Sequence, residues 1–192
     1  KIFDGNSKFK TSVIPTGNGR GMVMNTERAP FDNPKVRKAV RLAVDRQELV
    51  DTVMGGEAVV SCDTPVAPTD QYRHNMGCKQ NIAEAKKLLK EAGYPNGIEM
   101  VIHVSTKEPT WPTIAEVIQQ QVAKAGIKVD IKMTPSKSYW KETWMKKDVA
   151  MTRWNERSAD SVLHEVYHSS AKWNESYYKS SDFDKNLADA RG

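Results

Sequence analysis

The chain of 192 residues is long enough for one sizeable core or two very small ones. Hydrophobic residues make up 39% of it and charged residues 28%, and no run approaches the roughly 18 apolar residues that a membrane-spanning helix needs. The net charge of +5 would suit an anionic partner such as nucleic acid, but the lysines are interspersed with acidic residues along predicted helices. Neither a glycine–aromatic RNA motif nor zinc-finger spacing accompanies the charge, so a basic nucleic-acid-binding domain is the weakest hypothesis.

The N-terminal part of the chain predicts a lead-in, a strand and two helices. Residues 1–20 contain several glycines and a proline, and we expect them to precede the folded core. Residues 21–25 form a short apolar run that predicts the first strand. Asn33 before Pro34 is typical of a helix N-cap with proline in the first turn, and Asp45 is expected to cap a second, short helix.

The two cysteines, Cys62 and Cys78, lie in a polar stretch rich in turn residues. No C-x-x-C pattern surrounds them, which argues against a redox or zinc motif. We expect a disulfide between them, which requires an oxidising compartment and contributes about 3 kcal/mol if it is unstrained. The alternative is two unpaired thiols.

The middle of the chain alternates predicted helices with predicted strands. Helices are expected at 81–93 and 110–126, each with an apolar stripe at helical spacing and a glycine near its end. Met100, Ile102 and Val104 alternate with Val101 and His103, and residues 129–133 alternate apolar and polar side chains, so both segments are predicted to be strands. This interleaving favours an α/β fold in which helices pack on a sheet.

Further elements are expected towards the end of the chain. Residues 148–154 are a candidate strand, and Trp140 and Trp144, four residues apart on a predicted helix, are expected to share packing. Ser181 begins a capping-box pattern and predicts a last helix. Because no long linker divides the chain, residues 21–192 are predicted to form a single α/β domain, a mixed sheet with helices packed on it.

Five runs of residues follow one another in a recognisable order. They are Phe-Asp-Asn-Pro-Lys-Val-Arg-Lys-Ala at 31–39, Ala-Val-Asp-Arg at 43–46, Pro-Val-Ala-Pro at 65–68, Ala-Lys-Lys-Leu-Leu-Lys-Glu-Ala-Gly-Tyr-Pro at 85–95 and Ala-Gly-Ile-Lys-Val at 125–129. Each run alone is ordinary helix and turn sequence. Together, over nearly the whole chain, they resemble the extracellular solute-binding proteins of family 5, the peptide and nickel binders.

The resemblance implies a non-catalytic protein that encloses a small-molecule ligand between two lobes and delivers it to the membrane permease of an ABC importer. Members of the family are periplasmic or otherwise extracytoplasmic and are much longer than 192 residues. The chain is therefore expected to be one lobe, the second large one, of a bilobed periplasmic-binding-protein fold. The first lobe and a returning C-terminal segment would belong to the same polypeptide. The resemblance implies no cofactor and no metal.

The segment expected to face the ligand begins at Trp154, at the end of a strand, as is common in the family. Peptide-binding members often hold an aspartate three residues after this tryptophan, where it pairs with the ammonium group of the ligand. This chain has Arg157 there, and a guanidinium pairs with carboxylate or phosphate rather than with ammonium. If Arg157 contacts the ligand, we expect a peptide-like, anionic or sugar-like ligand. The alternative is that Arg157 stabilises its own loop through an ion pair with Glu156 or Asp160.

Four more residues complete the candidate ligand-binding set. Asn155 adjoins the tryptophan, and Asp160 is expected to contact the ligand or, preferentially, to cap the next helix. Trp173 and Asn174 join a flat apolar wall to an amide, a combination that is common in pockets. An isolated exposed tryptophan is the alternative.

Residues 164–168 fit the H-E-x-x-H pattern of zinc hydrolases, in which two histidines on one helix face hold zinc and the glutamate activates its water. A third ligand is required, and the extended pattern with a glycine and a third histidine does not follow. A hydrolase that uses His164, Glu165 and His168 is therefore the alternative function. A chance match on a helix is the better explanation.

Overall fold

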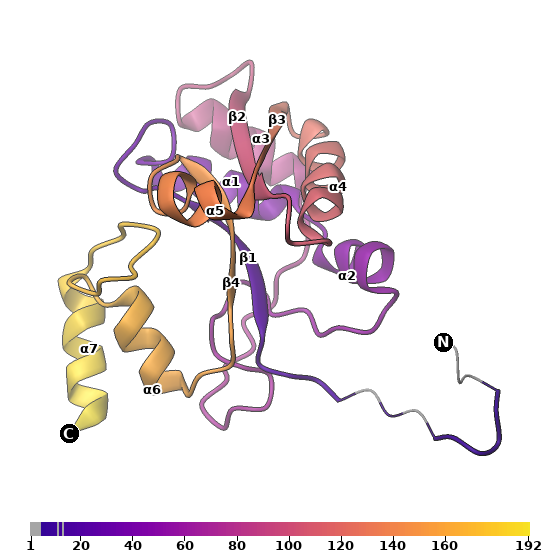
Figure 1. Cartoon of the computed structure of the whole chain (residues 1–192). Helices are drawn as coiled ribbons and strands as arrows, with labels where there is room; N and C mark the ends of the chain where they lie inside the picture. Colours follow the sequence, from indigo (N-terminus) through magenta and orange to yellow (C-terminus); the bar gives the residue numbers. More distant parts are fainter. Residues whose placement is uncertain (1–4, 11, 13) are drawn as a thin grey trace.

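One mixed sheet of four strands, in the order β1-β4-β2-β3, runs through the part of the chain that the structure describes (Figure 1). The structure is a computed structural model and describes residues 5–10, 12 and 14–192. β1 (Gly19–Met24) runs antiparallel to β4 (Val149–Trp154), and β2 (Ile98–Ser105) runs parallel to both β4 and β3 (Ile127–Thr134). The predicted α/β fold with a mixed sheet is confirmed.

The pairing of β1 with β4 fixes where β4 ends. Gly19 lies opposite Trp154, so the last residue of β4 lies beside the first residue of β1. On its other side, β4 pairs with β2 at a single register position, His103 opposite Ala150. The side chain of Tyr139 contacts both strands at this position. The Tyr139 hydroxyl lies 2.5 Å from the carbonyl oxygen of Met151 in β4 and 3.1 Å from that of His103 in β2.

The first helices begin where the sequence places their caps. The side chains of Asn33, Asp45 and Asn81 each accept a backbone N–H of the first turn that has no partner within the helix. The Thr110 side chain forms no such bond, but a proline occupies the first turn of the helix that follows it. The helices are α1 (Pro34–Ala43), α2 (Arg46–Met54), α3 (Ile82–Glu91) and α4 (Trp111–Ala123).

The core lies between the sheet and these helices. α4 packs on β2 and β3, α1 packs on α3, and Figure 1 shows the three helices gathered at the β2–β3 side of the sheet. Apolar side chains at helical and alternating spacing are removed from water there, which stabilises the fold by about 25 cal/mol for each Å² buried. The largest fully buried apolar side chains of the described residues are Phe31, Leu89, Ile102, Trp111, Ile127, Tyr139 and Met151.

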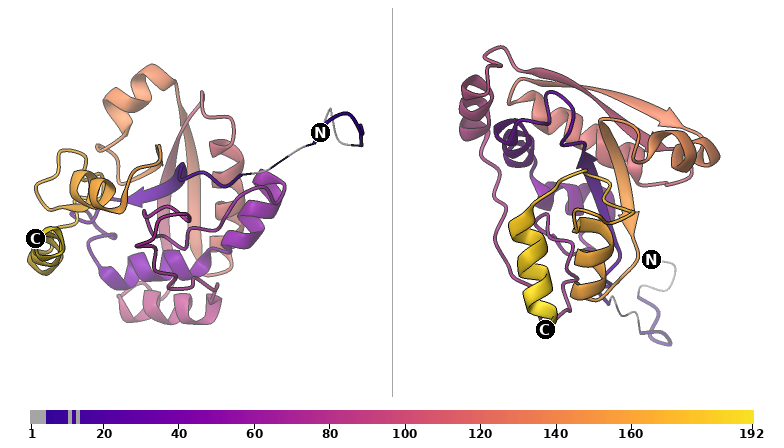
Figure 2. Two further views of the ribbon diagram at one scale, coloured as in Figure 1. Left: turned by 90° about the horizontal axis from the view of Figure 1, so that it is seen from below. Right: turned by 90° about the vertical axis from the view of Figure 1, so that its left-hand side faces the viewer.

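The last helices lie at the other end of the molecule. α6 (Ala159–Val162) continues into the π-helical turn η2 (Leu163–Tyr167), and α7 (Ser181–Arg191) lies beside it in both views of Figure 2. Arg191 at the end of α7 forms a salt bridge of 2.7 Å with Asp160 in α6. Among the described residues, no helix combines the length and apolar character needed to cross a membrane.

The start of α7 differs from the prediction by one residue. Ser180, not Ser181, has the extended backbone of an N-cap, and its hydroxyl accepts the N–H of Phe183. The Ser180 N–H donates in turn to the hydroxyl of Ser169, at 3.0 Å. This contact holds Ser180 at the start of the helix although the capping-box pattern favours Ser181.

The connecting elements after β3 bring two tryptophans towards β4. α5 (Ser136–Ser138) runs directly into the π-helical turn η1 (Tyr139–Thr143), and Trp144 follows at its end. The ring centroids of Trp140 and Trp144 lie 5.6 Å apart, so the predicted shared packing of these two side chains is confirmed.

Candidate functional site

A row of aromatic rings leads from the core to the end of β4. We call this set the aromatic row, and each ring lies between 5.4 and 6.4 Å, centroid to centroid, from the next. Trp111 at one end is completely buried, and Trp173 at the other is only half-buried. The rings meet at tilted or edge-to-face angles, which aromatic pairs prefer. In order, the members are Trp111, Tyr139, Trp140, Trp144, Trp154 and Trp173.

Arg157 packs against the last two rings of the aromatic row, whose centres are 5.8 Å apart. Its guanidinium carbon is 5.4 Å from the ring centre of Trp154 and 5.5 Å from that of Trp173. A cation at this distance over an indole face is attracted by the ring. The predicted site residues Trp154, Arg157 and Trp173 are thus brought together from β4, the loop after it and a loop beyond η2.

The guanidinium also forms an ion pair, but not with either partner that the sequence suggested. Arg157 binds Glu165 of η2 instead of Glu156 or Asp160. The other carboxylate oxygen of Glu165 accepts the hydroxyl of Ser161, at 2.9 Å. The Arg157 Nε is buried and has no hydrogen-bond partner among the described residues, so this donor is unused in the chain as described.

Glu175 forms hydrogen bonds with two members of the aromatic row. Its carboxylate accepts the indole N–H of Trp144 at 2.5 Å, the hydroxyl of Thr152 at 2.7 Å and the indole N–H of Trp154 at 2.9 Å. The residue is only 7% exposed. Burial raises the pKa of the Glu175 carboxyl above its ordinary value, against the opposing effect of the three donors.

Glu175 was missed as a site residue by the sequence analysis. Its signal was weak: one acidic residue directly after Trp173 and Asn174, in a stretch rich in aromatic side chains. The partners that make it important come from η1 and β4, and no local pattern connects those segments to it.

The remaining predicted site residues have different surroundings. Asn155 is exposed, whereas Asn174 is 5% exposed and donates its amide to the backbone carbonyl of Tyr178, at 2.7 Å. The preferred role of Asp160 as a helix N-cap is wrong. Ser158 caps α6 by accepting the N–H of Ser161, because Ser158 has the extended backbone and Asp160 is already helical.

The H-E-x-x-H segment does not have the geometry of a zinc helix. α6 is short and passes into a π-helical turn, and His168 has left the helical conformation, with ψ 141°. Glu165, which would activate the water, is bound by Arg157 and Ser161. Within the described ranges, no three His, Cys, Asp or Glu side chains are grouped closely enough to hold a metal ion.

A disulfide joins Cys62 to Cys78, with the Cα atoms 5.2 Å apart. The segment between them, residues 62–78, is called the disulfide loop. Its Asp70 carboxylate accepts the backbone N–H of Ala159, at 3.0 Å. The disulfide loop therefore contacts the start of α6, directly after the segment that carries Arg157.

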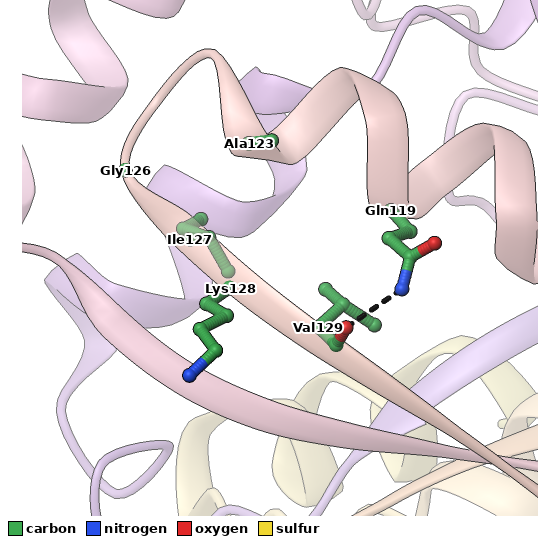
Figure 3. A pocket seen from close by; sticks show the side chains of 6 residues that line it. All are labelled: Gln119, Ala123, Gly126, Ile127, Lys128 and Val129. Carbon is green, nitrogen blue, oxygen red and sulfur yellow. Dashed lines mark hydrogen bonds between the residues drawn. The ribbon is translucent and has the colours of Figure 1, made fainter.

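A shallow hollow lies elsewhere, between α4 and β3 (Figure 3). The amide of Gln119 spans it and donates to the carbonyl oxygen of Val129, at 2.7 Å, which is the dashed line in Figure 3. Its one charged lining residue, Lys128, pairs with Glu99. This hollow lies at the β3 edge of the sheet, and β2 separates β3 from β4, the strand that leads to Arg157.

Comparison with known proteins identifies similar chains. The family described as "Bacterial extracellular solute-binding proteins, family 5 Middle" matches residues 1–174. The glutathione-binding protein GsiB of Pectobacterium atrosepticum is 33% identical over 132 residues, which are 68% of this chain and 26% of GsiB. GsiB of Escherichia coli is 33% identical over 131 residues, 68% of this chain and 25% of that protein. The chain thus spans about a quarter of the length of these relatives.

Solved structures resemble the fold over nearly all of the chain. The periplasmic binding protein DppA of Helicobacter pylori, in complex with the peptide STSA, matches with a TM-score of 0.81 and 30% identity, over 91% of this chain and 36% of DppA. NikZ of Campylobacter jejuni, in complex with Ni(L-His), matches with a TM-score of 0.84 over 99% of this chain and 42% of NikZ. At 21% identity, the likeness to NikZ shows the fold alone.

Proposed function

The chain belongs to family 5 of the bacterial extracellular solute-binding proteins of ABC importers, and on that premise we propose that residues 21–192 form one lobe of a two-lobed receptor. The receptor captures a small solute between its lobes and passes it to the membrane permease of its importer. Capture is non-catalytic and uses lobe closure. The glutathione and peptide named for similar proteins make small, polar, metabolite-like solutes the first candidates.

The observation that carries the proposal for the solute is the Arg157 guanidinium packed against the rings of both Trp154 and Trp173. The two indoles limit the positions of the guanidinium, whose planar fork of donors matches a carboxylate. Arg157 is 29% exposed in its side chain, so part of it is accessible from solvent. The solute therefore presents a carboxylate, or another oxygen-rich group, to the end of β4.

The Arg157–Glu165 pair sets a further requirement on the solute. In the chain alone Glu165 already neutralises the guanidinium, and Ser161 holds Glu165 in place. An incoming anionic group shares the exposed part of the guanidinium with Glu165 or displaces Glu165 from it. An uncharged group gains less at this position, because it cannot compete with a carboxylate for a charged donor.

A peptide-like solute with free carboxylates fits this arrangement. Glutathione, the solute named for the curated relatives, is a tripeptide with two carboxylates and is our first candidate. Trp154 and Trp173 would form apolar walls, and the exposed amide of Asn155 would supply polar contacts. Asp160 and Asn174 would support the site through their bonds to Arg191 and Tyr178.

The proposed place of action is the periplasm or another extracytoplasmic compartment. The family description is that of extracellular proteins. The disulfide between Cys62 and Cys78 is consistent with an oxidising compartment.

The experiment is to purify the complete polypeptide without denaturation, release bound small molecules and identify them by mass spectrometry. In parallel, its melting temperature is measured with glutathione, because a solute that binds only the folded state raises the melting temperature. We expect a carboxylate-bearing solute to be released and glutathione to raise the melting temperature. Release of a solute that lacks an anionic or oxygen-rich group would overturn the assignment of Arg157.

A further inference from the structure

The buried carboxylate of Glu175 is the meeting point of side chains from three separate segments. Trp144 follows η1, Thr152 and Trp154 belong to β4, and Glu175 itself lies in the loop that carries Trp173. We propose that Glu175 is a positioning residue, an inference that rests on the proposed function. Glu175 fixes the Trp154 ring against Arg157 and so sets where the guanidinium meets the solute.

The hydrogen bonds fix ring orientation and not only ring position. An indole has one polar atom, its Nε1–H, which can only donate. When that N–H is tied to an acceptor, the ring cannot turn over without losing the bond. Trp144 and Trp154 each donate to a different oxygen of Glu175, so one carboxylate orients both rings. The two rings lie 6.4 Å apart, at an angle of 61°.

Glu175 is also linked to the second ring that contacts Arg157. Its backbone N–H donates to the carbonyl oxygen of Trp173, at 2.7 Å, in a tight turn. Glu175 thus binds the Trp154 ring through its side chain and the Trp173 backbone through its own N–H. Both residues whose ring centres lie within 5.5 Å of the Arg157 guanidinium carbon are hydrogen-bonded to Glu175, but only the Trp154 ring is oriented by it directly.

Stability alone does not account for a carboxylate at this position. Removing a charged group from water is costly, and the described part of the chain gives Glu175 hydrogen bonds but no salt bridge. Apolar or amide side chains of similar size fill such space without burying a charge. A carboxylate is the side chain that accepts several hydrogen bonds at once, which is what orienting two indoles and a hydroxyl requires.

Direct contact of the Glu175 carboxylate with the solute is the other role to consider. The residue is 7% exposed, and both of its carboxylate oxygens are occupied by donors of the chain itself. A solute would have to displace an indole to reach it. The geometry therefore assigns Glu175 an indirect role, through Trp154.

The first test needs no solute. In the ¹⁵N-labelled chain, NMR follows the indole N–H signals of Trp144 and Trp154 and the side-chain signals of Arg157, which the two rings shift by their ring currents. The variants are Glu175→Gln, which keeps one acceptor oxygen, and Glu175→Leu, which keeps none. Glu108→Gln is the control, because the Glu108 carboxylate pairs with Arg153 of β4 rather than with an indole.

We expect slow solvent exchange of both indole protons in the unchanged chain and in the control. Glu175→Leu should expose both protons to exchange and move the Arg157 signals towards those of a free arginine, and Glu175→Gln should lie between the two. Unchanged Arg157 and Trp154 signals in Glu175→Gln would overturn the proposal. Because the glutamine variant keeps size and polarity, it decides the question even where the leucine variant fails to fold.

The second test is calorimetric titration of glutathione into the complete polypeptide. At a temperature where the solute-free proteins are all folded, Glu175→Gln should weaken binding roughly fivefold or more, and Glu108→Gln should leave binding unchanged. Failure of the unchanged protein to bind glutathione counts against the proposed solute and leaves the NMR result to decide the role of Glu175. Unaltered affinity in Glu175→Gln, with tight binding by the unchanged protein, would overturn the positioning role.

Discussion

The Asp70 carboxylate accepts a hydrogen bond from the backbone N–H of Ala159, at 3.0 Å, and so joins the disulfide loop to the start of α6. Ala159 is two residues beyond Arg157, and Ser158 between them caps the same helix. Within the disulfide loop, the Arg73 guanidinium donates to the carbonyl oxygen of Val66 at 2.5 Å. A loop that is distant in sequence thereby restrains the segment that presents Arg157.

Removing the Asp70 carboxylate should loosen that segment. Asp70→Ala leaves the first N–H of α6 without its acceptor, and the loss of a cap of this kind costs about 1 kcal/mol of unfolding free energy. Hydrogen exchange should show faster exchange at the Ala159 amide than in the unchanged chain. Asp70→Asn keeps an acceptor oxygen and should restore most of the protection. Equal exchange in all three proteins would mean that the contact does not restrain α6.

The disulfide should be closed in protein isolated from an oxidising compartment. Alkylation without reduction should label neither Cys62 nor Cys78, and reduction should expose both thiols. The double variant with serine at both positions should lose about 3 kcal/mol of unfolding free energy, the value for a loop of about 15 residues. Labelling of both thiols before reduction would remove this support for an extracytoplasmic location.

Gly97 should tolerate no side chain. Its φ is +88°, and a Cβ there would lie 1.8 Å from the carbonyl oxygen of Gly126, in the turn that precedes β3. We expect Gly97→Ala to lose well over about 2 kcal/mol of unfolding free energy or to fail to fold. Gly93 is the matched control, since its φ of +92° is similar but a Cβ would meet open space. Gly93→Ala should lose only about 1 kcal/mol, in urea unfolding. Equal losses in the two variants would contradict the close approach of the two turns.

The stability of the chain should depend on pH through Glu175. Because burial raises its pKa in the folded chain above the ordinary value of 4.5, the folded chain retains this proton at a pH where the unfolded chain has released it. Between the two pKa values, the stability contributed by this group therefore falls as pH rises, and it levels off above the raised value. Glu175→Gln lacks this titration.

Urea unfolding at several pH values between about 4 and 7 measures the effect. The unfolding free energy of Glu175→Gln minus that of the unchanged chain should increase as pH rises through this interval. Comparing the two proteins at each pH removes the titration of the other groups. A difference that is constant or that decreases with rising pH would contradict the raised pKa.

The elements that the sequence predicts well are those fixed by neighbouring residues. Asn33 and Asp45 cap their helices because the acceptor and the free N–H groups lie within three residues of each other. The two caps that were missed differ in kind. Ser180 rather than Ser181 caps α7, and the Ser180 backbone also binds Ser169, eleven residues away. Ser158 rather than Asp160 caps α6 through a local bond to Ser161, so there the error lay in the predicted start of the helix.

The candidate site follows the same division. The position of Trp154 at the end of β4 was predictable from the strand pattern and from the family resemblance. The pairing of Arg157 with Glu165 was not, because the two residues are eight apart and no local pattern distinguishes Glu165 from the nearer acidic residues Glu156 and Asp160. The role of Glu175 depends on two tryptophans from other segments, and only the folded chain brings them together.

The most direct test of ligand capture through Arg157 is the dissociation constant of glutathione, measured by calorimetry on the complete polypeptide with and without Arg157→Ala. Loss of a charge-assisted hydrogen bond costs about 1.5–3 kcal/mol, so the account predicts binding roughly tenfold to a hundredfold weaker in the variant. Arg157→Lys, which keeps the charge but not the planar fork, should lie between the two. An Arg157→Ala variant that binds glutathione as tightly as the unchanged protein would contradict the account. The role of Arg157 would then be confined to its ion pair with Glu165.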